Sequence, residues 1–422
     1  MANAFSKEER VAFEQMLEGF NDALVLSKNV NIYNTNSQEM ERSRDIIWRP
    51  QPYIMTSYSG TDATSNFKDV TQLAVPATLG YQRHVPMQLS AKQLRDMLQE
   101  GRLGSSAAQK LASDINVAIS NVASLQGTLV VKRTSAASGF DDIAQADSIL
   151  NENGVQMSDR YIALSSRDYN NMASSLSGRG TVAGKVLTAY DKANIGNISG
   201  FEAFKLDYAY RLAAKTAVTV TVNGANQYHT PAATSTATTG EVSNVDNRYQ
   251  NLAITVTSGT VAVGDAFTLA GVYSVHPITK QSTGQLKTFR VVEIVSGSGG
   301  TGTVKISPAI ISNGASTNAG AMYQNVSATP ANGAAVTFLN TVEAYANPFW
   351  FKDSIELLPG RIPVPTDSGA AVLRATTDNG VEIVMQKFYD INTQDIKYRW
   401  DTLYGVVNTN PEMNGIILFS QS

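Results

Sequence analysis

Ala217-Val-Thr-Val-Thr-Val222 begins the part of the chain that decides the fold, because the composition changes abruptly there. Residues 217–341 carry only nine charged side chains in 125 positions, whereas the other 297 residues carry sixty. Threonine, serine, glycine, alanine and valine dominate this stretch, and turn-rich clusters separate its short β-type runs. Such spacing is typical of a small all-β barrel or sandwich. The runs are residues 218–222, 252–256, 266–269, 289–294, 303–306 and 335–338.

The sequence on either side of this stretch has ordinary charge and mixes helical with strand-like segments. Residues 128–216 alternate short strands and helices without the regular βαβ order of a nucleotide-binding fold. After the stretch, strand-like runs return at residues 382–389, 397–404 and 415–419. We therefore expect residues 217–341 to be an insertion into an α+β domain, which resumes after it.

The first part of the chain predicts two helices joined by a long extended segment. Phe13, Met16 and Phe20 recur at helical spacing. Prolines and clustered turn residues forbid a long helix over residues 49–88, which favours an extended hairpin. Residues 89–127 then return to helical spacing. Two interpretations of the first helix stay open: a core-facing helix, or an arm that docks on a neighbouring subunit.

The composition argues against several classes of function. The chain has no cysteine, which excludes disulfides and thiolate metal sites. Its three histidines, His84, His229 and His276, are not at the spacing of metal ligands. The formal net charge of -3 gives no general attraction for phosphate backbones. We predict a protein that is not an enzyme, with no catalytic residues, no cofactor and no metal.

Two motifs resemble functional sites but have simpler interpretations. Ser296-Gly-Ser-Gly-Gly-Thr-Gly302 is followed by a strand-like run and not by the helix that a phosphate loop requires. It therefore predicts a hairpin loop. The Asp141-Asp142 pair stands at the start of a helical segment, where carboxylates cap the helix and complement its dipole. We expect a helix cap there and not an acid–base pair.

Seven short stretches, spread over nearly the whole chain, occur in an informative order. They are Ile46-Ile-Trp-Arg-Pro50, Gln88-Leu-Ser-Ala-Lys-Gln-Leu-Arg-Asp96, Gln109-Lys-Leu-Ala112, Val245-Asp-Asn-Arg-Tyr249, Gly264-Asp-Ala-Phe-Thr-Leu-Ala-Gly-Val272, Tyr404-Gly-Val406 and Asn410-Pro-Glu412. This order resembles that of the major capsid (coat) proteins of short-tailed enterobacterial phages with double-stranded DNA. That family has the tailed-phage (Hong Kong phage type) capsid fold with an inserted telokin-like, immunoglobulin-like domain.

The resemblance implies an α+β fold in which each part of the chain has a defined place. The expected parts are an N-terminal arm helix (1–48), an extended loop (49–88), the spine helix of a peripheral domain (89–127), an axial and peripheral α/β domain (128–216), the inserted β-domain (217–341), and a return segment that completes the axial and peripheral domains (342–422).

The resemblance also implies a function and partners. The chain would assemble with a scaffolding protein into an icosahedral procapsid of pentamers and hexamers, with a portal at one vertex. The shell would then expand and enclose the double-stranded DNA without sequence-specific binding. The expected location is the virion capsid, after assembly in the host cytoplasm and without a membrane.

Candidate intersubunit contacts lie in the arm, the extended loop and the insertion. Residues 230–240 hold no charged side chain, so few residues of the insertion are left nearby for charged contacts. The candidates are Phe13, Met16, Phe20, Arg49, Lys68, Asp69, Glu241, Asp246 and Arg248.

An alternative from another class is a surface binding or adhesion protein that uses the insertion as a β-sandwich recognition module. The abundance of threonine, serine and asparagine would suit this role. The charged beginning of the sequence, where a signal peptide would be apolar, is unfavourable to it.

Overall fold

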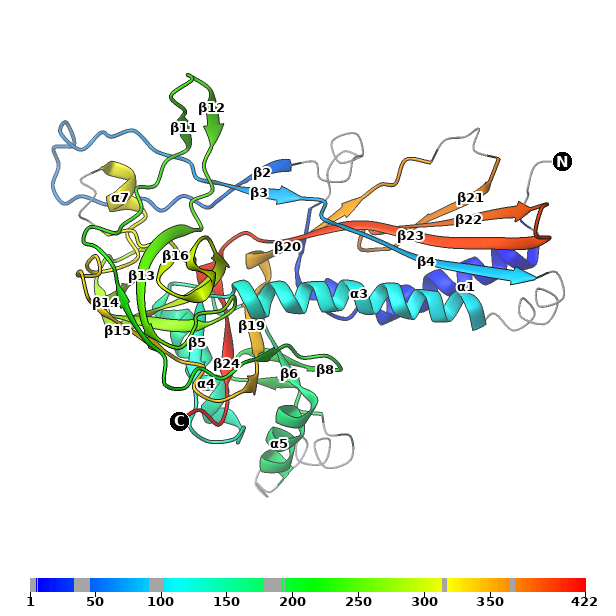
Figure 1. Ribbon diagram of the computed structural model, residues 1–422, viewed down its shortest axis with the longest axis horizontal. Helices are drawn as coiled ribbons and strands as arrows, with labels where there is room; N and C mark the ends of the chain where they lie inside the picture. Colours follow the sequence, from blue (N-terminus) through cyan, green and yellow to red (C-terminus); the bar gives the residue numbers. More distant parts are fainter. Residues whose placement is uncertain are drawn as a thin grey trace. The chain divides into compact units, whose positions relative to one another are not determined.

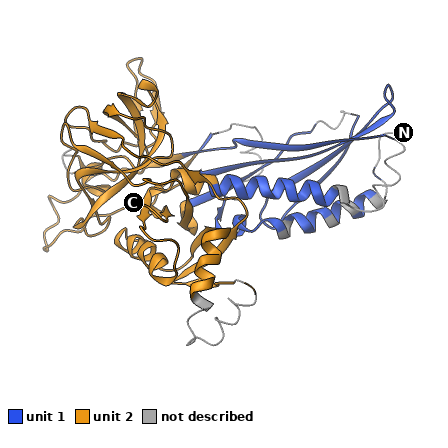
Figure 2. Ribbon diagram, turned by 60° about the horizontal axis from the view of Figure 1, so that its bottom comes forward, with its two compact units in different colours: residues 1–47, 76–120, 355–407 blue, residues 48–75, 121–354, 408–422 orange. Residues whose placement is uncertain are grey.

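The computed structural model describes most of the chain (Figure 1). The described residues are 5, 7–33, 46–90, 102–177, 192, 194–312, 317–364 and 369–422. They form two compact units, which are coloured separately in Figure 2. Unit 1 comprises residues 1–47, 76–120 and 355–407, and unit 2 comprises residues 48–75, 121–354 and 408–422. Each unit is therefore assembled from segments that are far apart in the sequence.

In its described residues, unit 1 has a six-stranded sheet and the helices α1 and α3. The strand order is β1-β20-β23-β22-β21, and β4 pairs separately with β23. The long strand β23 organises the sheet, because it pairs with β4 continuously from Asp395 opposite Ser90 to Tyr404 opposite Tyr81. The elements are α1 (Lys7–Ala23), most of α3 (Arg102–Gln126), β1 (Asn31–Ile32), β4 (Tyr81–Ser90), β20 (Ile355–Gly360), β21 (Ala371–Thr376), β22 (Glu382–Asp390) and β23 (Asp395–Asn408).

Helix α1 buries its apolar stripe inside its own subunit. Phe13, Met16 and Phe20 are 6%, 1% and 0% exposed. Their spacing places them on one helical face, as the sequence predicts. Of the two interpretations kept open above, the core-facing helix describes their position in the single chain.

Polar contacts hold both ends of α1. Near its start, the carboxylate of Glu9 accepts hydrogen bonds from Lys387 Nζ and Tyr398 Oη, both at 2.7 Å, on the sheet. At its end, Asn116 of α3 donates from Nδ2 to the carbonyl of Ala23 at 3.0 Å, one of the carbonyls that the helix itself leaves unpaired. The helix is thus fastened to both other layers of unit 1.

Helix α3 lies within residues 89–127, where the sequence predicts helical structure. Leu111, Ile115, Ile119 and Val122 are buried, as their spacing predicts. The helix continues through Gly104. The start of the prediction differs, because residues 89 and 90 belong to strand β4, and residues 91–101 lie outside the described residues. None of the described helices is long and apolar enough to cross a membrane.

Unit 2 contains a mixed sheet with the order β5-β24-β19-β6-β8-β7. Helices α4 and α5 contribute buried apolar side chains to its core, among them Ile143, Leu150 and Met172. The helices and strands expected between residues 128 and 206 are confirmed where they are described. The elements are β5 (Leu129–Lys132), α4 (Phe140–Glu152), β6 (Arg160–Ser165), α5 (Ser166–Ser177), β7 (Asn197–Ile198), β8 (Phe201–Leu206), β19 (Asn347–Phe351) and β24 (Asn414–Leu418).

The insertion in unit 2 is a closed barrel with the strand order β10-β13-β16-β15-β14-β17. Five of its six strands contain a whole run that the composition singled out, and β10 covers all but the first residue of the sixth, which confirms the inserted β-domain. Phe267 and Phe289 stack in its core with their ring centroids 5.7 Å apart. The strands are β10 (Thr219–Val222), β13 (Gln250–Ser258), β14 (Ala266–Val275), β15 (Ser282–Ile294), β16 (Gly302–Ser307) and β17 (Ala335–Phe338).

Three smaller elements of unit 2 accompany the barrel. The antiparallel pair β9 (Arg211–Leu212) and β18 (Ala344–Tyr345) brings the two ends of the insertion together. A hairpin of β11 (Thr234–Thr236) and β12 (Val242–Asn244), which the sequence did not predict, projects from the barrel (Figure 1). The short helix α7 (Asn318–Met322) follows the last-but-one barrel strand.

The extended segment begins at β2 (Ile46–Pro50) and ends at β3 (Ala74–Thr78), which pair with each other. Residues 51–73 between them have no regular strand or helix. The chain then continues into β4, so residues 81–88, which we assigned to the extended loop, form part of the sheet of unit 1.

The contacts of Glu9 lead to a prediction for unit 1. Changing Glu9→Gln keeps the shape of the side chain but removes the charge beside Lys387, so we expect the free energy of unfolding to fall by about 2 kcal/mol. Urea denaturation measures this change. Glu14→Gln on the exposed face of the same helix is the control. Equal stability of the two variants would contradict the fastening role of Glu9.

Candidate functional site

The junction between the barrel and the mixed sheet gathers buried charges of unit 2. Strand β15 supplies three polar side chains to it, Lys287, Thr288 and Arg290. The opposite side of the junction is made by the end of α3, the start of β5 and the turn before β24. These partners are far from the insertion in sequence, so the junction exists only in the folded unit.

Arg290 caps the C-terminus of α3. Its guanidinium is fully buried and donates to the carbonyls of Ser124 at 2.7 Å and Gly127 at 3.3 Å, and to that of Gly264 at 3.0 Å. Burial lowers the pKa of Arg290 to about 10, while the nearby charge of Asp265 acts in the opposite direction. The side chain is still cationic at neutral pH, and a cation at this position complements the negative end of the helix dipole.

Gly127 allows the chain after α3 to pack closely against strand β24. A Cβ atom at residue 127 would lie 2.6 Å from the carbonyl oxygen of Ala123 and 3.0 Å from both Asn414 Oδ1 and the Cα of Gly415. Helix α3 ends at Gln126, the residue before Gly127. The reason for glycine here is close packing against β24.

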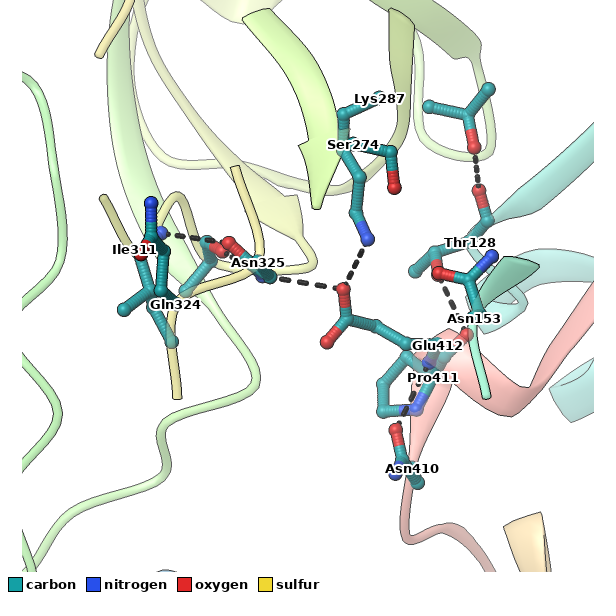
Figure 3. Close-up of polar contacts among 12 residues, drawn as sticks. Thr128, Asn153, Ser274, Lys287, Ile311, Gln324, Asn325, Asn410, Pro411 and Glu412 are labelled. Carbon is teal, nitrogen blue, oxygen red and sulfur yellow. Dashed lines mark hydrogen bonds and ion pairs between the residues drawn. The ribbon is translucent and has the colours of Figure 1, made fainter. Parts of the chain in front are cut away.

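Glu412 lies between Lys287 and Asn325 (Figure 3). Its Oε1 accepts from Lys287 Nζ at 2.5 Å and from Asn325 Nδ2 at 3.2 Å. The Lys287 side chain is only 2% exposed, so an ion pair there needs its partner held in place. Beside it, the hydroxyl of Thr128 donates to the carbonyl of Pro411 at 2.6 Å. The turn before β24 is thus tied to the barrel and to β5.

A second lysine of the barrel faces the same carboxylate. Lys280 Nζ donates to the carbonyls of Met322 at 2.5 Å and Gln324 at 3.3 Å. Burial lowers the pKa of Lys280 to about 8, and the charge of Glu412 opposes this shift. We did not single out Lys280, Lys287, Arg290 or Glu412 from the sequence. For Lys287 and Arg290 the available signal was a cation within a strand-forming stretch of a charge-poor domain.

The charged candidates of the insertion bind each other or stay exposed. Arg248 forms two hydrogen bonds with Asp246, at 2.9 Å and 2.6 Å, and donates to the carbonyl of Asn408 at 2.6 Å. Arg248 is only 8% exposed, so this pair is occupied within its own subunit. Glu241 is exposed in the hairpin between β11 and β12. The structure therefore brings Asp246 and Arg248 together and leaves Glu241 apart from them.

The extended segment presents the remaining candidates. Lys68 and Asp69 are exposed within it, and Arg49 is half-buried on β2. Several apolar side chains of the segment are also exposed, and Phe67 is the most exposed of them at 84%. The others are Tyr53, Met55, Tyr58 and Val70. The sequence did not predict that these apolar side chains are exposed.

The minor motifs have the local roles that the sequence predicts. Residues 296–302 connect β15 and β16, so the glycine-rich run is a hairpin loop. Asp142 accepts from the backbone N–H groups of Ser138 at 2.7 Å and Gly139 at 3.3 Å, which confirms a cap at the start of α4. Within the described residues, no group of three acidic, histidine or cysteine side chains could hold a metal ion.

The chain is similar to known proteins over nearly its whole length. A family model described as "P22 coat protein - gene protein 5" matches residues 1–420. The chain belongs to the P22 coat protein family. It is therefore a phage coat protein, which forms the capsid shell with copies of itself and has a structural role. This finding favours the capsid interpretation over the surface-binding alternative.

Relatives of this coat protein include a curated major capsid protein. The protein from Acyrthosiphon pisum secondary endosymbiont phage 1 is 23% identical, and the match covers 98% of both chains. The solved CUS-3 coat protein I-domain is 40% identical over 30% of this chain and 99% of its own, with a TM-score of 0.23. A structure from Mycobacterium phage Che8 covers 94% of this chain and 92% of its own, at 9% identity and a TM-score of 0.46.

The helix cap made by Arg290 leads to a prediction for the coat subunit. Arg290→Met leaves three buried carbonyls without their charged donor, so we expect the free energy of unfolding to fall by about 3 kcal/mol. Urea denaturation of unassembled subunits measures it.

The isolated insertion is the control for this substitution. Residues 217–341 contain the whole core of the closed barrel, so we expect this fragment to unfold in one cooperative thermal transition. It lacks the carbonyls of Ser124 and Gly127 and keeps only that of Gly264, so Arg290→Met should cost clearly less in it than in the full chain. A similar loss in the fragment and the full chain would show that the junction is not the cause.

Proposed function

We propose that this coat protein builds an icosahedral procapsid of pentamers and hexamers together with a scaffolding protein and a portal at one vertex. Assembly takes place in the host cytoplasm, and the shell later expands around packaged double-stranded DNA. The observation that carries the proposal is the extended segment of residues 51–73. It leaves apolar side chains exposed in the single chain, whereas the apolar stripe of α1 is buried.

The extended segment is the proposed docking element between subunits. Phe67 is 84% exposed and Met55 is 60% exposed, which is unfavourable for a subunit that stays alone in water. Covering these side chains on a neighbouring copy supplies an apolar contact. Lys68 and Asp69 stand beside Phe67 and can orient that contact through opposite charges. Repetition around a closed ring converts individually weak contacts into a stable shell.

The hairpin of β11 and β12 is a second proposed contact. It projects from the barrel, and Val242 on it is 62% exposed. Glu241 is the single charged side chain of the hairpin, residues 234–244. The nearby Asp246 and Arg248 bind each other within their own subunit. We therefore expect contacts through this hairpin to depend on backbone and neutral polar groups, and to respond weakly to salt.

The proposed relation to DNA is that of a container. The net charge of -3 provides no general electrostatic attraction for a phosphate backbone. Enclosing a genome without sequence-specific binding is compatible with such a charge, because tight binding to the shell would resist packaging.

Removal of the extended segment tests the docking role. The backbone N–H of Gln51 donates to the carbonyl of Leu73 at 2.8 Å, so a short glycine–serine turn can replace residues 52–72. We expect soluble subunits that form no closed shells when co-expressed with the scaffolding protein, as seen by negative-stain electron microscopy. A deletion of residues 50–86 would be less informative, because it also removes most of β4. Normal shells from the replacement would refute the docking role.

A point substitution separates docking from stability. Phe67→Ser should leave the free energy of unfolding within about 0.5 kcal/mol of the original, because the side chain is exposed. It should nevertheless slow shell formation, measured by light scattering. Phe140→Ser, at an exposed phenylalanine of α4, is the matched control. If both variants assemble like the unmodified chain, Phe67 is not a docking residue.

A further inference from the structure

The insertion carries a surface that contacts the two ends of the extended segment. These ends, residues 51–54 and 71–74, are called the root of the segment. This surface, the α7 shelf, consists of residues 309–311 and 317–323, which lie after the barrel strand β16. We propose that the α7 shelf positions the extended segment for docking on a neighbouring subunit. The inference rests on the proposed docking role of that segment and assigns the insertion a part in it.

Apolar contacts form the first part of the hold. Leu73, at the end of the extended segment, is 3% exposed and packs in a cluster with side chains of the shelf. Ile54, at the beginning of the segment, packs against the same cluster. Both ends of the segment therefore meet on one apolar surface. The shelf residues of this cluster are Ala309, Ile311, Ala319, Met322 and Tyr323.

A hydrogen bond adds direction to this contact. The hydroxyl of Tyr323 donates to the backbone carbonyl of Thr71 at 2.8 Å, and Tyr323 itself is only 8% exposed. Burial raises the pKa of Tyr323, which keeps the phenol protonated and able to donate. The tyrosine thus fixes the backbone of the segment at one point, two residues before the apolar anchor Leu73.

The root is also tied to other parts of unit 2. Ala74 forms a parallel bridge with Asp246, next to the buried Arg248. On the opposite strand of the root, Gln51 Nε2 donates to the carbonyl of Thr409 at 3.0 Å. These ties and the shelf hold the base of the segment on both of its strands.

The tip of the segment, residues 55–70, is packed differently from its root. A cavity of about 200 Å³ separates part of the tip from the shelf, and its lining includes Phe67 and Met55 of the tip and Met322 of α7. The root is anchored while the apolar tip stays open. This division suits a preorganised docking element, because an anchored root loses less conformational entropy when the tip binds.

Loosening the shelf by one hydrogen bond tests the inference on unassembled subunits. Tyr323→Phe removes only the hydroxyl. We expect chymotrypsin to cleave after Leu73, which is buried on the shelf, about fivefold faster, because cleavage there follows the population in which the root is open. Shell formation should slow in parallel. Tyr273→Phe, at an exposed tyrosine of the same insertion, is the control and should change neither rate.

A second variant keeps the test decisive. Met322→Ala opens the apolar part of the shelf and should accelerate cleavage further, while the cooperative transition of the barrel is retained because Met322 lies outside the barrel core. Unchanged cleavage in both variants would overturn the positioning role. Faster cleavage with normal shell formation would also overturn it. Failure of the docking proposal is distinguishable, because Phe67→Ser would then assemble normally whatever the cleavage rates are.

Discussion

The guanidinium of Arg290 is the point on which unit 2 depends. It is fully buried, it comes from the middle of a barrel strand, and it satisfies carbonyls at the end of α3. Without it, the carbonyl of Ser124 in the last turn of α3 and that of Gly127 just after the helix would lose a buried donor. The insertion is therefore part of the framework of the subunit and not an appendage joined to it by two linkers. The ion pair of Lys287 and Glu412 strengthens the same junction.

This framework separates the surfaces that keep the subunit together from those that face outward. The apolar stripe of α1 and the pair of Asp246 and Arg248 are used inside the single chain. The tip of the extended segment and the β11–β12 hairpin are not. For a coat protein this separation is useful, because a subunit must fold before it meets its neighbours, and its assembly contacts must be weak enough to correct errors. The α7 shelf would connect the two sets by holding a docking element on the folded framework.

Most of the local structure was predictable from the sequence. The six barrel strands followed from β-branched runs between turn clusters, and the buried face of α3 followed from helical spacing at Leu111, Ile115 and Ile119. These signals are local, because propensity and periodicity act over a few residues. The order of the parts was sufficient to indicate the coat protein family. The hairpin of β11 and β12 was not predicted. Most of β4 was assigned to the extended loop because of prolines such as Pro86, although an edge position in a sheet tolerates proline.

The sequence by itself determined the inserted β-domain, the helices around it and the class of protein. Only the tertiary structure decided which strands pair, which charges meet and which apolar side chains remain uncovered. Strand β4 forms because β23, about three hundred residues later, offers its edge. Lys287 and Glu412 meet across 125 residues, and Arg290 reaches a helix that ends before residue 130. Such contacts are set by chain topology, because burial makes a charge dependent on whichever partner the fold brings within hydrogen-bonding distance.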